Sequence, residues 1–184
     1  QLALDHNVKI INDIDLFVET KPKAKIIGIT GTNGKSTTVA LLHHILKFNK
    51  IKSVIGGNFG FPACQIIDPG DNGIIILELS SYQLDGASKL ILNLASIINI
   101  TPDHLDYHDN FETYISCKLK ILNFLSDNGT LVLNKNNELL DRLINKAKYK
   151  RINILKTQTI NYKDVINDNA SLEGTHNQVN ASIA

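Results

Sequence analysis

The sequence of 184 residues contains no methionine and only two cysteines. Two thiols are too few for a disulfide framework and lack the spacing of a zinc site, so we expect Cys64 and Cys117 to be reduced thiols. Because there is no initiator methionine, we expect the chain to be a segment of a longer protein. No apolar run reaches the ~20 residues that span a bilayer, and the N-terminus lacks the basic and apolar parts of a signal peptide.

The charges of the sequence are nearly balanced, with 19 basic and 18 acidic residues and a net charge of +1. This balance gives no electrostatic reason to bind nucleic acid or an acidic membrane surface. The chain is long enough for one sizeable domain with a buried core. It has no repeat, heptad or low-complexity tract, so a globular domain with neither nucleic acid nor a membrane as partner is expected.

Short apolar runs alternate along the chain with longer stretches of helical period. Two of the runs lack polar alternation, which is typical of strands covered on both faces. The predicted strands are residues 25–30, 53–55, 74–79, 95–100 and 130–133, and the predicted helices are residues 36–48 and 113–125. This alternation predicts an α/β fold of the P-loop NTPase type, with a mostly parallel, doubly wound sheet and right-handed crossovers.

The two ends of the chain carry weaker signals. Residues 8–11 are predicted as a short strand and residues 15–19 as a helical turn. The runs between residues 151 and 172 are short and interrupted by polar residues, which favours a small antiparallel appendage.

A glycine-rich turn, from Gly28 to Thr37, stands between the first predicted strand and the first predicted helix. Backbone N–H groups and the positive end of the helix dipole favour a polyphosphate at such a turn. Lys35 is placed for the β- and γ-phosphates and Ser36 for Mg²⁺. The usual phosphate loop has a glycine where this sequence has Ile29. The residues expected to bind the nucleotide here are Gly31, Thr32, Asn33, Gly34, Lys35, Ser36 and Thr37.

Further polar side chains follow the other predicted strands at their carboxyl ends, where ligands of such sheets bind. Asn58 follows the second strand, and Glu78 and Ser80 close the third. Asp103 and His104 follow the fourth. Glu78 is either a half-exposed strand end or a Mg²⁺ ligand, and the phosphate loop favours the ligand.

Lys118 is the most informative single side chain. It lies in line with Tyr114 and Leu122 on the predicted helix, so we expect it to point toward the core. A buried lysine has a lowered pKa and more neutral amine, the form that reacts with CO₂ to give a carbamate. The alternative is a lysine that extends out of the apolar stripe to water. Lys120 faces the other way and is expected to be solvated.

The histidines are less distinctive. His43, His44 and His108 are expected to be ordinary histidines without a catalytic role. Imidazole is not a typical Mg²⁺ ligand, so chemistry alone does not select His104. Asp103 is the harder ligand and remains a secondary candidate.

Several segments resemble the Mur ligase family and occur in the order found there. The segment 77–84 (Leu-Glu-Leu-Ser-Ser-Tyr-Gln-Leu) is the most discriminating, because other members of the superfamily carry different residues after the glutamate. The resemblance covers residues 8–184. The segments that carry it are residues 31–37 (Gly-Thr-Asn-Gly-Lys-Ser-Thr), 56–60, 77–84, 99–106, 117–121 and 174–180.

The resemblance implies an ATP-dependent, ADP-forming ligase of peptidoglycan precursor synthesis, acting as a cytoplasmic monomer. The branch resembled adds D-glutamate to UDP-N-acetylmuramoyl-L-alanine (UDP-MurNAc-L-Ala) through an acyl phosphate. Residues 1–20 are then the tail of an N-terminal UDP-binding domain and residues 21–184 the central ATP-binding domain, with the C-terminal amino-acid-binding domain absent. Such a fragment is expected to be inactive alone.

The resemblance also implies ligands for individual residues. Asn58 and Ser80 would contact the muramoyl substrate. In the family, the segment that contains His176 places Asn177 and Asn180 on the adenine ring.

Two Mg²⁺ ions and three catalytic residues are implied as well. Ser36 and Glu78 belong to the metal-ligating set, and His104 and a carbamoylated Lys118 would hold the second ion. The catalytic residues would be Lys35, His104 and Lys118.

Two alternatives to this ligase stay open. The first is that the chain is a catalytically incompetent ATP-binding remnant. The second is a ligase like folylpolyglutamate synthase, and the segments 56–60 and 77–84 argue against it.

Overall fold

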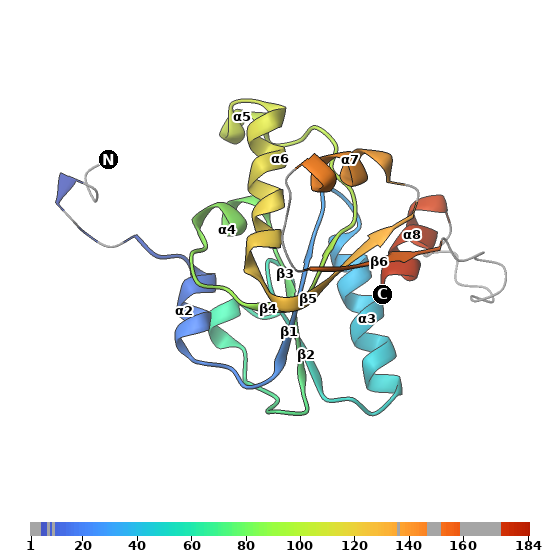
Figure 1. Ribbon diagram of the computed structural model, residues 1–184. Coiled ribbons are helices and arrows are strands. Elements are labelled where there is room, and N and C mark those ends of the chain that lie inside the picture. The colour runs from blue at the N-terminus through green and yellow to red at the C-terminus, as the bar shows by residue number, and fades with distance from the viewer. Residues whose placement is uncertain (1–4, 7, 9, 136, 147–151, 159–173) are drawn as a thin grey trace.

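The computed structural model describes residues 5, 6, 8, 10–135, 137–146, 152–158 and 174–184. Its centre is a sheet that is six-stranded in this part of the chain, with the order β2-β3-β1-β4-β5-β6 (Figure 1). Every neighbouring pair is parallel, which confirms the predicted α/β fold. The strands are β1 (Lys25–Thr30), β2 (Ser53–Gly57), β3 (Ile74–Glu78), β4 (Leu92–Ile97), β5 (Leu125–Asn134) and β6 (Asn153–Thr157).

Helices cover both faces of the sheet (Figure 1). One face carries α2 (Asp13–Glu19), α4 (Ser81–Gly86), α6 (Phe111–Leu119) and α7 (Glu138–Lys146). The other face carries α3 (Lys35–Phe48) and α8 (Thr175–Ile183). Three short elements complete the set: α5 (Leu105–His108) and the 3₁₀ turns η1 (Ala63–Gln65) and η2 (Lys120–Phe124). Within the described ranges, no helix is both long enough and apolar enough to cross a membrane.

The apolar side chains of the strands pack into two cores, one on each face of the sheet. In β3, Ile75 and Leu77 enter the larger core, whereas Ile76 between them enters the smaller one. The smaller core also contains Ile29 of β1 and Val39 of α3. Because successive side chains of a strand point to opposite faces, a strand covered on both sides must be apolar throughout.

The predicted antiparallel appendage is wrong for residues 153–157. These residues form β6, which pairs in parallel with β5 in the main sheet. Most of the β6 side chains are exposed, because the strand lies at the edge of the sheet, and this exposure explains its polar interruptions. The rest of the predicted appendage, residues 159–173, lies outside the described residues.

Smaller differences concern the ends of elements. The predicted strand at residues 8–11 is wrong, because its described residues are not part of any strand. The predicted helix at residues 113–125 begins earlier, at Phe111, where the Asn110 side chain accepts a hydrogen bond from the Thr113 N–H (2.8 Å). It continues past Leu119 as the 3₁₀ turn η2, the tighter geometry that is common at helix ends.

Helix α2 packs against the same core as the sheet, although it precedes the first strand. Ile14 and Phe17 are fully buried in the larger core. Asn12 caps the helix by accepting a hydrogen bond from the Asp15 N–H (2.9 Å). This region is therefore integral to the fold.

Replacing Phe17 by alanine tests this packing. Phe17 is 1% exposed and Leu16 on the same helix is 43% exposed. We expect Phe17→Ala to lower the free energy of unfolding by about 3–5 kcal/mol, because it opens a cavity in the core. Leu16→Ala should cost about 1 kcal/mol or less, and equal losses in denaturant unfolding would contradict the placement of α2.

Candidate functional site

The phosphate loop connects β1 to α3, as the sequence predicts. Gly34 caps α3 with a backbone φ of 83°, in the left-handed region that glycine adopts without strain. The N–H groups of the first turn, beginning at Lys35, have no partners within the helix and point out of its N-terminus. Together with the helix dipole they form a site for an anion.

Asn99, just beyond β4, holds the loop in this shape. Its side-chain Oδ1 accepts hydrogen bonds from the N–H groups of Thr32 (3.0 Å) and Asn33 (2.9 Å). Its Nδ2 donates to the Asn33 carbonyl oxygen (3.0 Å). Sequence reasoning assigned no role to Asn99, because an asparagine that hydrogen-bonds a distant loop has no local signature.

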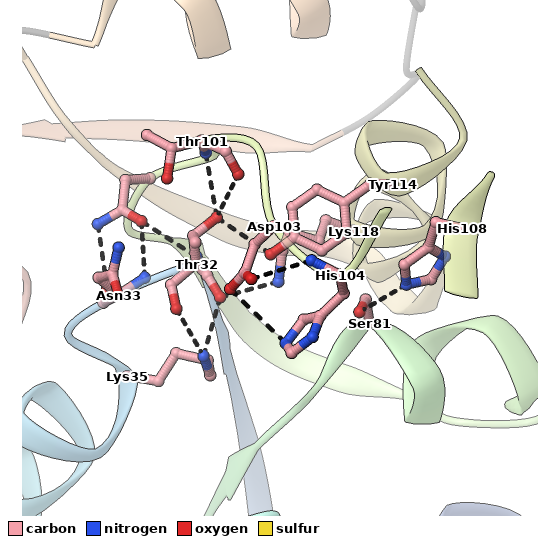
Figure 2. Close-up of polar contacts among 12 residues, drawn as sticks. Thr32, Asn33, Lys35, Ser81, Thr101, Asp103, His104, His108, Tyr114 and Lys118 are labelled. Carbon is pink, nitrogen blue, oxygen red and sulfur yellow. Dashed lines mark hydrogen bonds and ion pairs between the residues drawn. The ribbon is translucent and has the colours of Figure 1, made fainter. Parts of the chain in front are cut away.

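Two lysines converge on the carbonyl oxygen of Gly31. Lys35 Nζ donates to it at 3.0 Å, and Lys118 Nζ, from α6, donates at 2.8 Å. Lys35 Nζ also donates to the Thr32 carbonyl oxygen (3.0 Å). Figure 2 shows both side chains beside Thr32. Two of the three predicted catalytic residues are thus brought together at the loop.

Lys118 points into the core, as its helical position predicts. Its side chain is 2% exposed. Burial, and next the positive charge of Lys35, lower the pKa of Lys118 from 10.5 to about 7. The neutral amine is therefore far more abundant near neutral pH than in an ordinary lysine.

Tyr114 supports Lys118 from one turn earlier on α6. Its ring centre lies 4.7 Å from Lys118 Nζ. The Thr32 hydroxyl donates to the Thr101 carbonyl oxygen (3.1 Å) and accepts from the Thr101 N–H (3.0 Å). Its single proton is then used, so the Tyr114 hydroxyl donates to Thr32 Oγ1 (3.1 Å). This network connects α6 to the phosphate loop (Figure 2).

Glu78 is a buried carboxylate, 1% exposed, at the end of β3. Its two oxygens accept hydrogen bonds from Ser36 Oγ (2.8 Å) and Asn58 Nδ2 (2.8 Å). Among the described residues no lysine or arginine forms an ion pair with it. A buried carboxylate between neutral oxygen and amide groups suits a hard divalent cation such as Mg²⁺. The residues predicted for a metal, Ser36 and Glu78, therefore fit one.

A pocket of about 270 Å³ opens beside the two lysines. Five residues predicted from the sequence line it, together with three others. Its lining is Lys35, Asn58, Ser80, Ser81, Tyr82, His104, Tyr114 and Lys118. The carboxyl ends of neighbouring parallel strands therefore gather the predicted side chains, as expected.

His104 stands at the mouth of this pocket with its side chain about half exposed. Its backbone φ of 51° is in the left-handed region, which is unusual for a residue with a side chain. Its Nε2 lies 3.6 Å from Asp103 Oδ2, and its ring centre lies 5.3 Å from that of Tyr82. Within the described ranges no three acidic, cysteine or histidine side chains form a metal cluster. His104 and Lys118 share the pocket as separate polar groups.

His108 has a structural environment that the sequence did not predict. It is buried, and its Nε2 lies 2.9 Å from Ser81 Oγ (Figure 2). Its ring also lies 5.3 Å from that of Tyr114, and burial lowers the pKa of the imidazole. His43 instead hydrogen-bonds Ser53, away from the pocket (2.9 Å).

Asn177 and Asn180 lie on α8, on the other side of the phosphate loop. Both are buried, and Asn180 Nδ2 donates to Asn177 Oδ1 (3.0 Å). A Cβ on Gly34 would lie 2.3 Å from Asn180 Oδ1, so the helix closes directly over the loop. A second pocket of about 240 Å³ beside α8 is lined by Ile98, Asn99, Asn134, Asn137, His176 and Val179. The two predicted asparagines sit next to this pocket's lining residues in the helix.

The lowered pKa of Lys118 predicts how stability depends on pH. The unfolded chain binds this proton below about pH 10.5, whereas the folded protein binds it only below about pH 7. The stability contributed by Lys118 therefore rises between these values and is lowest below pH 7. Lys118→Met should stabilise the protein most at pH 6, and this gain should shrink by up to about 1.4 kcal/mol per pH unit above pH 7.

The measurement is denaturant unfolding from pH 6 to pH 9 in buffer freed of CO₂. Lys120→Met is the matched control, since Lys120 is exposed and pairs with Asp85 (2.6 Å). The Lys120 salt bridge holds the pKa of Asp85 below its usual value, so the control should show no slope in this range. A gain from Lys118→Met that does not change with pH would contradict the burial of a titrating amine.

Comparison with known proteins places these features in a family. A family model described as the Mur ligase middle domain matches residues 29–184. The UDP-N-acetylmuramoylalanine–D-glutamate ligase of Zymomonas mobilis subsp. mobilis is 37% identical over 190 residues. That match covers 100% of this chain and 43% of the relative, so the chain spans less than half the length of that protein.

Solved structures show the same fold at lower identity. The MurF ligase from Thermotoga maritima in complex with ADP matches with a TM-score of 0.61 and 19% identity, covering 83% of this chain and 38% of that one. The UDP-N-acetylmuramate:L-alanyl-gamma-D-glutamyl-meso-diaminopimelate ligase from Neisseria meningitides matches with a TM-score of 0.69 and 18% identity. This second match covers 99% of this chain and 66% of that one.

Proposed function

Because this chain belongs to the Mur ligase family, we propose that the complete protein adds D-glutamate to UDP-MurNAc-L-Ala at the expense of ATP. The reaction would serve peptidoglycan precursor synthesis in the cytoplasm, and the protein would act as a monomer. Residues 21–184 would be its central ATP-binding domain, following the tail of a UDP-binding domain. The name of the Zymomonas relative supports this substrate pair.

The single observation that supports the proposal most is the convergence of Lys35 and Lys118 on the Gly31 carbonyl oxygen. It sets a cationic phosphate-loop lysine beside a buried amine, and both line a pocket that Asn58 and Ser80 also line. A nucleotide-binding loop with no reacting partner would not require the second lysine. The arrangement suits transfer of a phosphoryl group to an acceptor in the pocket.

In the proposed reaction, the carboxylate of UDP-MurNAc-L-Ala attacks the γ-phosphorus of ATP and ADP leaves. The amine of D-glutamate then attacks the acyl phosphate and displaces phosphate. Lys35 would leave the loop carbonyls and pair with the transferred group, neutralising its charge. The first-turn N–H groups of α3 would fix the polyphosphate in line with the acceptor.

Ser36 and Glu78 would hold one Mg²⁺, and His104 and a modified Lys118 would hold a second. When bound, these ions supply positive charge that stabilises the transferred phosphoryl group. The modification would be a carbamate: the neutral Lys118 amine adds to CO₂, a nitrogen–carbon bond forms and a proton is released. The pKa of about 7 supports this step, because it supplies the neutral amine near neutral pH.

Asn58 and Ser80 would contact the muramoyl substrate from the carboxyl ends of β2 and β3. Asn177 and Asn180 would contact the adenine ring from α8. Both asparagines of α8 are buried, so this contact requires the adenine to reach between α8 and the loop.

Removing the phosphate-loop lysine tests the proposed chemistry. We expect Lys35→Ala to slow ligation of D-glutamate by about 10²–10³-fold or more, because charge on the transferred group is no longer neutralised. The assay uses the complete protein encoded by the gene, with ADP release and product formation measured together. Lys47→Ala, on the exposed end of the same helix, is the control and should retain full turnover. Undiminished ligation by Lys35→Ala would remove Lys35 from the mechanism.

The same assay separates the two other candidates from this one. A complete protein that binds ATP but ligates nothing would be an incompetent remnant. Preference for a folate over UDP-MurNAc-L-Ala would favour a folylpolyglutamate synthase. The 184 residues alone are expected to ligate neither, because they span 43% of the Zymomonas relative.

A further inference from the structure

Polar contacts join the start of α2 to α4, although these helices are far apart in the sequence. Asn12 Nδ2 donates to the Gln83 carbonyl oxygen (2.9 Å), and Gln83 Nε2 donates to Asp13 Oδ2 (2.8 Å). In the same turn of α2, Asp15 accepts from the N–H (2.9 Å) and the hydroxyl (3.1 Å) of Ser88, which follows α4. The first turn of the helix that precedes β1 is therefore hydrogen-bonded to the helix that follows β3 and to Ser88, just beyond that helix.

The Asp13 carboxylate and the Ser80 N–H together determine which way the Gln83 amide faces. An ionised carboxylate only accepts hydrogen bonds, so the NH₂ group of Gln83 must face it. The amide oxygen of Gln83 is then turned toward Ser80. It accepts from the Ser80 N–H (3.2 Å) and from the Ser80 hydroxyl (3.2 Å).

The orientation of Gln83 in turn determines what Ser80 presents to the pocket. The Ser80 hydroxyl donates its one proton to Gln83 Oε1 and accepts from the Gln83 N–H (3.2 Å). One lone pair of Ser80 Oγ remains, and Ser80 lines the pocket. In this arrangement Ser80 accepts a hydrogen bond from a ligand and does not donate one.

We infer that Asp13 and Gln83 are positioning residues that make Ser80 a hydrogen-bond acceptor for the substrate. The group it accepts from is an amide N–H or a sugar hydroxyl, and not a phosphate or carboxylate oxygen. This inference rests on the proposed function, since it takes Ser80 to contact the muramoyl substrate. It assigns α2 a role in substrate binding although α2 itself does not line the pocket.

An exchange of functional groups between positions 13 and 83 tests the inference. Gln83→Glu places a second carboxylate against Asp13, so the side chain is repelled and Ser80 loses its acceptor. Adding Asp13→Asn restores every hydrogen bond, because the new amide at position 13 donates to the new carboxylate at position 83, which still accepts from Ser80. Asp13→Asn alone keeps an acceptor for Gln83 and should change little.

The Michaelis constants of the complete protein are measured for UDP-MurNAc-L-Ala and for ATP. We expect Gln83→Glu to raise the Michaelis constant for UDP-MurNAc-L-Ala about tenfold and to leave that for ATP within about twofold of wild type. The double variant Asp13→Asn/Gln83→Glu should return to within about threefold of wild type. Asp15→Asn is the structural control: it weakens the docking of α2 through Ser88, so it should lower the melting temperature without changing either constant.

Three results would overturn the inference in an active wild-type protein. The first is a Michaelis constant for UDP-MurNAc-L-Ala that Gln83→Glu leaves unchanged. The second is a double variant whose constant is raised as much as that of Gln83→Glu. The third is a rise of this constant in Asp15→Asn equal to the rise in Gln83→Glu. A wild-type protein that ligates no UDP-MurNAc-L-Ala overturns the proposed function and this inference together. The two failures are therefore distinguishable by wild-type turnover.

Discussion

The backbone carbonyl of Gly31 is the point on which the arrangement of the site depends. It accepts hydrogen bonds from Lys35 in the loop and from Lys118 in α6. Burial lowers the pKa of Lys118, and the positive charge of Lys35 at the same acceptor lowers it further. The shared contact thus joins α6 to the loop and keeps the buried amine of Lys118 beside a second cation.

The rest of the site follows from the direction of the strands. Because all neighbouring strands are parallel, their carboxyl ends meet at one edge, where Glu78 ends β3 and Asn58 follows β2. Glu78 is buried among neutral donors, whereas Lys118 is buried beside another cation. The surroundings of Glu78 thus suit a nearby cation, and those of Lys118 suit a neutral amine.

The local features of this site were predictable, and its long-range contacts were not. Helical spacing alone places Lys118 in the core, and a glycine-lysine turn after an apolar run locates the phosphate loop. The contacts of Asp13 with Gln83 and of His108 with Ser81 join segments that no sequence period relates. The strand β6 was misjudged for a related reason, because its polar residues reflect an edge position that only the assembled sheet defines.

The contact between Gly34 and Asn180 has a consequence for how such a protein can vary. A Cβ at position 34 would overlap the Asn180 side chain, and the backbone φ of 83° disfavours any other residue there. A loop and a helix that are far apart in the sequence therefore share one small volume. Substitutions at the two positions are not independent, and tolerance at one is set by the size of the residue at the other.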